Sequence, residues 1–197
     1  MNKIFIIIVV VIALVGGYFL LNSQPSENDA TNRQNVVNEK ADHKNISYMI
    51  EGESIKLENG IAETEVTPDA ASKVVTRYFG NELVTDLDGD GLQDVAFILT
   101  QDRGGSGTFY YAVAALKTEE GYIGSDGYLL GDRIAPQSTD ISPNQKHKYV
   151  VVFNYADRAK DEPMTASPSV GKSAYLKLNP DRMQWGIVVP DFEGESR

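Results

Sequence analysis

The chain has 197 residues, 42% of them hydrophobic, and a formal net charge of −10 from 18 Lys and Arg against 28 Asp and Glu. This length allows one domain and a tether, and the acidic excess argues against a nucleic-acid partner, which requires clustered basic side chains. The sequence has no cysteine, which excludes disulfides, zinc–thiolate sites and a lipid-modified cysteine.

An apolar run from Ile4 to Leu21 follows Lys3 and contains no charged residue. As a helix with a rise of ~1.5 Å per residue it spans about 27 Å, close to the hydrocarbon thickness of a bilayer. We therefore predict an N-terminal signal anchor or transmembrane helix at residues 1–21, and favour it over a cleavable signal peptide because the cleavage sites are only fair. The flanking charges place the N-terminus in the cytoplasm and the C-terminal domain outside it, in a single-pass membrane protein. Cleavage would instead give a secreted protein.

Residues 22–45 are mostly Asn, Ser, Gln, Glu, Asp and Lys. Because such a composition cannot bury a core, we predict a disordered linker there. An extracytoplasmic β domain is expected over residues 46–190 and a disordered tail over residues 191–197.

The domain consists of short alternating or β-branched runs separated by turn residues, which predicts a mainly β fold: a single antiparallel sandwich or small barrel. Asn59-Gly60 between two alternating runs predicts a hairpin. Thr67–Ala71 offers an alternative helix start. The expected strands are Ser54–Leu57, Ile61–Val66, Val74–Phe79, Asp94–Thr100, Phe109–Leu116, Tyr122–Leu130, Ile134–Ile141, Tyr149–Tyr155, Ala174–Leu178 and Gly186–Val189.

A calcium site is predicted in the segment between Asp86 and Asp94. Carboxylates occupy positions 1, 3, 5 and 9 of this loop, glycine occupies position 6, and the backbone carbonyl of position 7 is a further ligand. An EF-hand is excluded because Phe97 stands where its bidentate Glu is required. The alternative is a solvated acidic turn without an ion. The predicted calcium ligands are Asp86, Asp88, Asp90, Leu92 and Asp94.

This loop resembles the DxDxDGxxD loop of FG-GAP and VCBS repeats, in which a strand follows the calcium ligands. A wider stretch, from about Tyr48 to Lys177, resembles a family of uncharacterised exported bacterial proteins, anchored or lipoprotein-like. The resemblance rests on Thr76–Asn81, Asp86–Thr100, Gly104–Tyr111, Leu130–Ile134 and Asn154–Arg158. It implies an envelope location and a β fold, and it implies no activity.

No catalytic residue or organic cofactor is predicted. Val170–Ser173 imitates the end of a phosphate-binding loop, but Ala166 replaces a required glycine. Gly104–Thr108 lacks the final glycine of a nucleophile elbow, so we predict a hairpin turn there. The two histidines, His43 and His147, lie in the linker and in a polar turn.

A group of polar residues near strand ends is either a small binding cleft or a set of turn caps and surface ion pairs. Aromatic residues of the neighbouring strands would line such a cleft, although aromatics in strands are more often core. The polar residues are Arg133, Asn154, Asp157 and Arg158, and the aromatics are Tyr110, Tyr111, Tyr128, Tyr155 and Trp185.

The leading hypothesis is a non-enzymatic, calcium-binding module of the cell envelope, attached to the membrane by its helix and acting on an unidentified envelope ligand or protein. Two alternatives stay open: a hydrolase of envelope polymers that uses paired carboxylates, and an inhibitor or accessory subunit of an exported enzyme.

Overall fold

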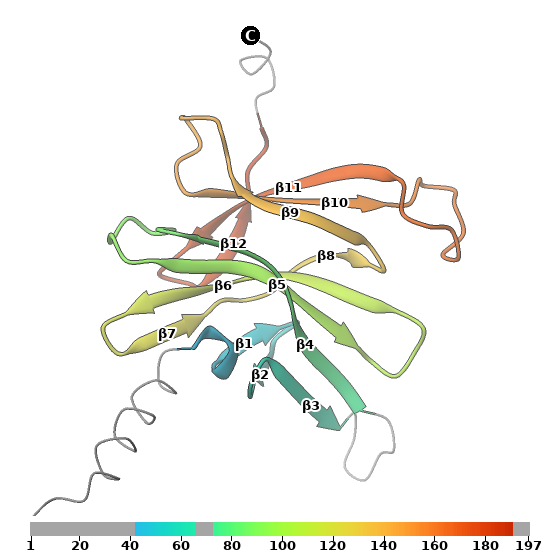
Figure 1. Cartoon of the computed structure of the whole chain (residues 1–197), viewed down its shortest axis with the longest axis horizontal. Coiled ribbons are helices and arrows are strands. Elements are labelled where there is room, and N and C mark those ends of the chain that lie inside the picture. The colour runs from blue at the N-terminus through green and yellow to red at the C-terminus, as the bar shows by residue number, and fades with distance from the viewer. Residues whose placement is uncertain (1–41, 66–72, 191–197) are drawn as a thin grey trace, which may run out of the picture. The chain divides into compact units, whose positions relative to one another are not determined.

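The computed structural model describes residues 42–65 and 73–190, all within one compact unit. In this part of the chain every pairing between strands is antiparallel, and the helical structure is a single 3₁₀ turn, η2 (His43–Asn45). The prediction of a mainly β, antiparallel fold is thus confirmed (Figure 1). The predicted anchor at residues 1–21, the linker up to residue 41, the helix start at residues 67–71 and the tail at residues 191–197 lie outside the described residues. Over residues 42–65 and 73–190 no helix is long and apolar enough to cross a bilayer.

Within the described residues the strands form three sheets. A two-stranded sheet pairs β1 (Ser47–Ile50) with β2 (Glu53–Lys56). A six-stranded sheet contains β3 (Ile61–Glu65), β4 (Lys73–Thr85), β5 (Asp94–Asp102), β6 (Thr108–Thr118), β7 (Gly121–Gly124) and β8 (Tyr128–Asp132). A four-stranded sheet contains β9 (Ala135–Ile141), β10 (Val150–Asp157), β11 (Val170–Asn179) and β12 (Gln184–Ile187).

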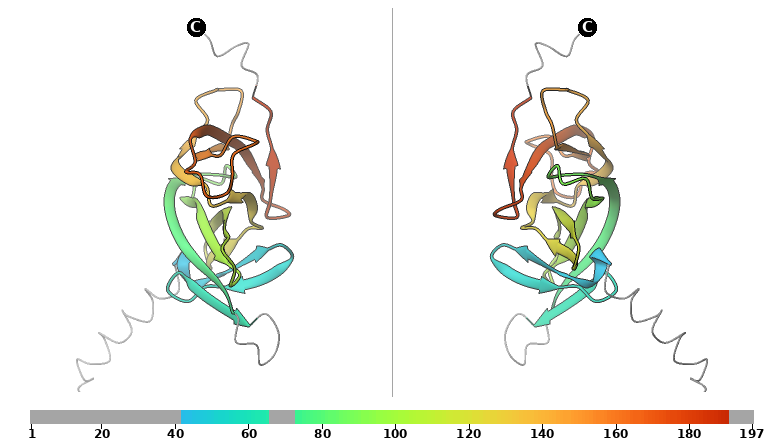
Figure 2. Two further views of the ribbon diagram at one scale, coloured as in Figure 1. Left: turned by 90° about the vertical axis from the view of Figure 1, so that its right-hand side faces the viewer. Right: turned by 90° about the vertical axis from the view of Figure 1, so that its left-hand side faces the viewer.

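The six-stranded sheet is buried on both faces, because its central strands β5 and β6 contribute alternate residues to two separate cores. On one face, Ile98 packs with Phe153 and other residues of the four-stranded sheet. On the other face, Phe97 packs with Tyr48 and other residues of β1 and β2. Figures 1 and 2 show the six-stranded sheet between the four-stranded sheet and the β1–β2 sheet. Burial on both sides explains why β5 and β6 are continuously apolar in sequence and do not alternate with polar residues.

The ends of most predicted strands shift by a few residues, and two predicted strands change more, one by extension and one by division. The strand predicted to end at Phe79 continues as β4 to Thr85, because Gly80 and Asn81, with φ of 116° and 52°, form a bulge and do not form a turn. The strand predicted over Tyr122–Leu130 is divided into β7 and β8.

The division between β7 and β8 results from a long-range contact. The buried Ser125 hydroxyl accepts a hydrogen bond of 2.8 Å from the backbone N–H of Ala114, at the place where a continuous strand would pair with β6. Gly124 and Gly127 flank this residue, and a Cβ at either glycine would meet β1 at 2.1 Å from the Ser47 carbonyl oxygen or 2.5 Å from Ile50 Cδ1. The two glycines therefore let the chain pass close under β1.

The predicted hairpin at Asn59-Gly60 is correct as a turn and wrong as a strand pair. Both residues have positive φ, 53° and 81°, as a tight turn of this type requires. However, only Glu58 and Ile61 pair across the turn. Beyond them β2 pairs with β1 and β3 pairs with β4, and Ile55 of β2 is buried in the same core as Tyr48 and Ile50 of β1.

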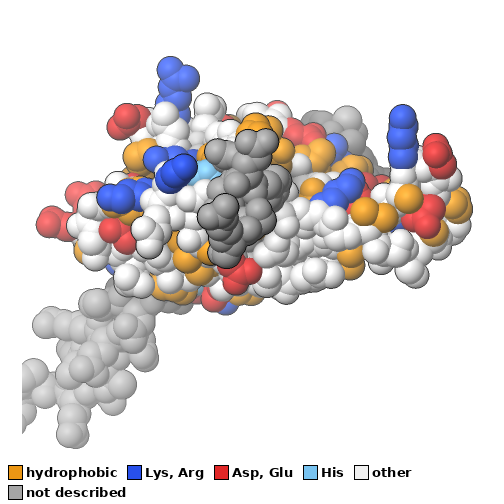
Figure 3. All heavy atoms as spheres, turned by 90° about the horizontal axis from the view of Figure 1, so that it is seen from above, with side chains coloured by type: hydrophobic (Ala, Val, Ile, Leu, Met, Phe, Trp, Pro, Cys, Tyr) orange, Lys and Arg blue, Asp and Glu red, His pale blue; other side chains and the backbone are white. Residues whose placement is uncertain are grey.

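Figure 3 shows the molecule from above the four-stranded sheet of Figure 1. On this face Lys and Arg side chains are interspersed with Asp and Glu, and hydrophobic side chains lie between them. The predicted turn at Gly104–Thr108 is confirmed as the connection between β5 and β6. Val170–Ser173, which precede the strand predicted from Ala174, already belong to β11. An extended strand there leaves no phosphate-binding loop at these residues.

Candidate metal centre

The predicted calcium loop connects β4 to β5, and its first carboxylate organises the turn. The Asp86 carboxylate accepts backbone N–H groups from Asp88 at 3.2 Å, Gly89 at 2.6 Å and Gly91 at 3.1 Å. Asp88 in turn accepts the N–H of Asp90 at 3.1 Å. These short-range hydrogen bonds fold the loop back on itself, so that side chains at alternate positions converge.

The structure brings three of the four predicted carboxylates together. Oxygen atoms of Asp86, Asp88 and Asp94 all lie within 4.8 Å of one another. Calcium–oxygen distances are about 2.3–2.6 Å, so two ligands on opposite sides of one ion are roughly 4.6–5.2 Å apart. The three oxygens therefore fit around a single calcium ion, and an oxygen-only donor set of this kind suits a hard divalent cation.

Asp90 and Leu92 do not belong to this group of three carboxylates. Asp90 Oδ1 accepts the backbone N–H of Leu92 at 2.7 Å, and Asp90 is exposed. The Leu92 side chain is exposed as well, at 38%. Asp90 thus stabilises the second half of the loop in this structure, while the other predicted aspartates converge.

Asp94 is the buried carboxylate of the group, with no exposed surface. Its two oxygens accept the N–H of Leu87 at 2.8 Å and the N–H of Lys117, on β6, at 2.7 Å. Burial raises the pKa of the Asp94 carboxyl, the two N–H groups lower it, and the carboxylates of Asp88 and Asp90 raise it again. A cation bound among these carboxylates would offset both the burial and the mutual repulsion.

Glycine is required at Gly89 for two reasons. Its φ is 93°, in the region that disfavours residues with a side chain. In addition, a Cβ at this position would lie 2.9 Å from the hydroxyl oxygen of Tyr149, the residue that precedes β10. Gly91, with a φ of 86°, has open space where a Cβ would be, so only its backbone conformation requires glycine.

Two contacts of the loop were missed in the sequence analysis, those with Tyr149 and with the backbone of Lys117. Both residues are far from the loop in sequence, and nothing local to either of them indicates the contact. A groove next to the loop is lined by Asp88, Asp90 and Lys117, and the Lys117 ammonium lies 4.4 Å from the centre of the Tyr122 ring.

The polar residues considered for a binding cleft have separate partners. Arg158 donates to the carbonyl oxygens of Ala166 at 2.7 Å and Arg133 at 2.9 Å, which ties two loops together. Asp157 pairs with Lys172 at 2.8 Å.

The remaining two residues of this set also have local partners. Arg133 pairs with the neighbouring Asp132 at 2.9 Å. Asn154 donates to Ser138 and Asp140 and accepts from Ser173. These contacts match the interpretation as turn caps and surface ion pairs. Of the predicted aromatics, Tyr111 belongs to the core beside β1 and β2, and Tyr110, Tyr128, Tyr155 and Trp185 pack against the core between the larger sheets.

His43, which the sequence analysis assigned to the linker, packs on the domain. Its Nε2 lies 2.7 Å from Glu82 Oε1, and its ring meets the rings of Phe97, Tyr122 and Tyr78 edge-on at 5.2, 6.0 and 6.1 Å between centroids. The sequence signal for this contact is weak, because a single histidine among polar residues has no periodic context.

Comparisons with known proteins do not add a name to this site: no protein-family model matches the chain, and neither a curated protein nor a solved structure matches it.

Proposed function

We propose that this protein is a calcium-binding β domain, a single sandwich of sheets held outside the cytoplasm by an N-terminal transmembrane helix, that serves as a binding or structural module of the cell envelope. The observation that carries the proposal is the convergence of Asp86, Asp88 and Asp94 within 4.8 Å on a loop with the ligand spacing of calcium sites. The location rests on the apolar run from Ile4 to Leu21 and its flanking charges.

The carboxylates of Asp86, Asp88 and Asp94 would hold the ion. The ion would supply positive charge that joins the end of β4 to the start of β5 and, through Asp94, to β6. Asp90 and the Leu92 carbonyl, the other predicted ligands, would complete the coordination after a change in the loop. Calcium is favoured over magnesium because magnesium requires shorter distances, about 2.0–2.1 Å, and near-ideal octahedral geometry.

The alternative of a carboxylate-dependent hydrolase has weaker support. Four of the described carboxyls have lowered pKa values. Glu51, Glu63 and Asp157 accept hydrogen bonds from Arg103, Lys73 and Lys172, and Glu82, despite its burial, accepts them from Tyr78 and His43. A general acid requires a raised pKa instead. Among the described carboxyl groups a raised pKa is found at Asp94, which lies in the proposed calcium site.

The test is thermal unfolding of the full-length chain in mild detergent, with 1–5 mM calcium against EDTA and with magnesium as a second cation, since extracellular calcium modules have Kd values of roughly 10⁻⁴–10⁻³ M. Calcium at about ten times its Kd adds roughly 1.4 kcal/mol, which corresponds to a rise in Tm of about 3–6 °C. An equal Tm in calcium and EDTA would remove calcium from the proposal.

A further inference from the structure

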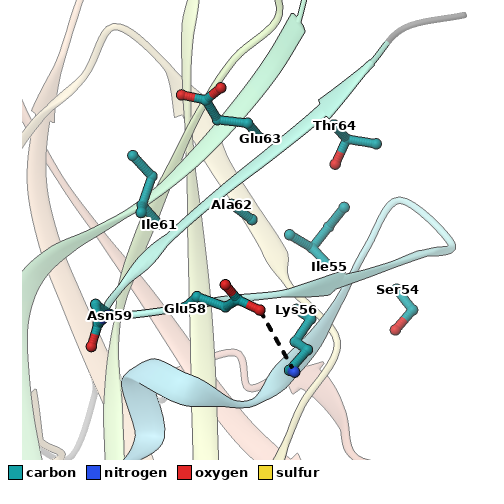
Figure 4. A pocket seen from close by; sticks show the side chains of 9 residues that line it. All are labelled: Ser54, Ile55, Lys56, Glu58, Asn59, Ile61, Ala62, Glu63 and Thr64. Atoms are coloured by element: carbon teal, nitrogen blue, oxygen red, sulfur yellow. Dashed lines mark ion pairs between the residues drawn. The ribbon is translucent and has the colours of Figure 1, made fainter. Parts of the chain in front are cut away.

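Two strand edges of the domain, those of β2 and β3, face each other without pairing. The tight turn at Asn59-Gly60 joins β2 to β3, and one pair of residues bridges the two strands next to it. Beyond this pair the strands diverge, as Figure 4 shows, with β2 joined to β1 and β3 joined to β4 on their other sides. The other edge of β1 is already occupied, because Met49 bonds to Ser125 and Gly127. The open edges are therefore those of β2 and β3.

The backbone hydrogen bonds show which residues face the opening. Glu58 and Ile61 exchange N–H···O bonds of 2.8 and 3.2 Å across it. Gly60, one residue earlier on the β3 side, accepts the N–H of Tyr78 from β4 at 2.7 Å. Because backbone groups alternate in direction along a strand, Ala62 and Thr64 bond to β4.

It follows that Glu63 and Glu65 of β3 present their N–H and C=O groups to the opening. The same alternation holds for β2, where Leu57 donates to Ile46 on the β1 side at 3.0 Å. Ser54 and Lys56 therefore present their backbone groups to the opening from the opposite side. Two ladders of backbone donors and acceptors that pair with no other described residue thus face a common groove, which is a template for an added strand.

The groove between the two edges has a volume of about 610 Å³. Its lining includes the exposed side chain of Ile61 and the small side chain of Ala62, together with charged residues at its rim (Figure 4). An added strand would therefore find both a hydrogen-bonding edge and a limited apolar surface.

The charge of the residues around the opening indicates the charge of the peptide segment that would bind there. From Glu53 to Glu65 the chain contains four Glu and one Lys, a net charge of −3, and Lys73 and Arg77 of the neighbouring β4 reduce this acidic excess to −1. Lys56 is paired with Glu58 at 3.8 Å and Lys73 with Glu63 at 2.9 Å, so among the described residues Glu53 and Glu65 are the glutamates of this stretch without an ion pair. A second copy of the chain is disfavoured, because antiparallel pairing of β3 with itself about Glu63 would place two glutamates opposite each other.

We propose that the open edges of β2 and β3 bind an extended, basic peptide segment of a partner protein, which adds as a strand antiparallel to β3. Main-chain hydrogen bonds to Glu63 and Glu65 provide the pairing. Lys or Arg of the segment meets Glu53 and Glu65, the glutamates of this stretch that have no ion pair among the described residues. This inference does not depend on the calcium site, because none of its residues belongs to the loop.

The test uses the full-length chain in mild detergent and the synthetic peptide acetyl-TKVKVKT-amide, with residue-resolved hydrogen–deuterium exchange as the readout. Without peptide, the amides of Glu63 and Glu65 should exchange rapidly, while those of Ala62 and Thr64 should already be protected by β4. With saturating peptide, the exchange of Glu63 and Glu65 should slow by about tenfold or more. The amides of Ala62 and Thr64 serve as internal controls and should change little. The same result is expected in calcium and in EDTA.

Two substitutions at one position separate the contributions of charge and backbone. Glu63→Ala keeps the outward N–H and should weaken peptide binding by at most about fivefold, the effect of one cross-strand charge pair. Glu63→Pro also removes the N–H, which β4 does not use, and should weaken binding by a further factor of about ten. Should Glu63→Pro fail to fold, the peptide acetyl-TEVEVET-amide is the second measurement, and it should not bind.

Several results would overturn the inference. They are equal binding of the basic and acidic peptides, equal binding by the Ala and Pro variants, and binding without protection at Glu63 and Glu65. Protection of these amides before peptide is added would also overturn it. In that case dependence on protein concentration would identify a second copy as the occupant, and independence would identify a segment of the same chain.

Discussion

The aspartates of the β4–β5 loop differ in what surrounds them, although the sequence presents them as equivalent. Asp94 is fully buried and bonded to two backbone N–H groups, Asp86 organises the turn, and Asp90 is exposed and turned to the N–H of Leu92. Asp88 is the member of the converging group whose carboxylate holds the fewest internal hydrogen bonds. It is therefore the residue at which metal binding can be removed with the least damage to the fold.

Asp88→Asn should abolish most of the calcium-dependent rise in Tm while changing the Tm in EDTA by little, about 2 °C or less. Asp90→Asn should keep a larger part of the calcium effect, because Asp90 is outside the group of converging oxygens. Glu119→Gln, which removes a charge beside the loop without touching the three carboxylates, is the matched control. Thermal unfolding in calcium and EDTA provides the comparison, and equal losses in all three variants would indicate a general charge effect.

A second residue-level prediction concerns Glu51, in the turn between β1 and β2. Hydrogen bonds from Arg103 and Tyr111, at 2.7 and 2.8 Å from Oε1, lower the pKa of Glu51 below its ordinary value of 4.5. Because the folded-state pKa is below the unfolded-state value, ionised Glu51 contributes stability above about pH 4.5, and this contribution is lost as the pH falls through the folded-state pKa.

Glu51→Gln should accordingly lower the free energy of unfolding at pH 7 by less than about 1 kcal/mol, a small effect because the side chains of Glu51 and Arg103 are both partly exposed. It should also flatten the dependence of stability on pH below about pH 4.5. Denaturant unfolding from pH 3 to pH 7 measures both effects, with Glu120→Gln as an exposed control. If the free energy of unfolding of Glu51→Gln depended on pH as in the unmodified chain, the Glu51–Arg103 contact would make no measurable contribution to stability.

At the scale of elements, the loop and the four-stranded sheet are linked through Gly89 and Tyr149. Gly89→Ala should destabilise the chain by roughly 1–3 kcal/mol, because the new Cβ meets the tyrosine hydroxyl and the backbone conformation disfavours alanine. Adding Tyr149→Phe removes the oxygen nearest to that Cβ. It should therefore restore only the share of the lost stability that comes from the steric contact. Gly91→Ala, with the same backbone conformation and open space around it, is the control for the conformational part. Denaturant midpoints of the three variants and the double variant test this account, which fails if the double variant recovers nothing.

The elements also show how far local sequence predicts this fold. β5 and β6 were predicted within a few residues because continuous apolar runs between turn residues are a strong local signal. β1 was missed, since four residues next to a polar linker contain too little pattern. The break between β7 and β8 depends on Ser125 bonding to Ala114, a contact that no local pattern encodes. In the site, the spacing of the aspartates predicted the converging carboxylates, whereas Tyr149 could be found only from the tertiary structure.

For the whole molecule, the arrangement in three layers implies a gradient of local stability. β5 and β6 pair on both edges and are covered on both faces, whereas β12, β7 and β3 are short strands at the edges of their sheets. Amides of β5 and β6 should therefore exchange by global unfolding and those of the edge strands by local opening, at rates at least about a hundredfold higher. Native-state hydrogen exchange measures this order. The slowest exchange in β9–β12 would contradict it and show that the four-stranded sheet is the more stable layer.

The position of His43 affects how the domain would respond to a pulling force, if it is attached to a membrane through its N-terminus as proposed. A force applied on the N-terminal side of Asp42 reaches the His43–Glu82 contact of 2.7 Å and the 2.9 Å hydrogen bond between Lys44 and Gly60 before it reaches the β1–β2 ladder. These contacts would therefore break first, at a lower force than the pairing between strands, and the sheets would stay folded. In single-molecule pulling from the two termini, His43→Ala should remove or weaken a small early rupture and leave the force of the main unfolding event unchanged. A lower main force would instead show that the turn is part of the mechanical core.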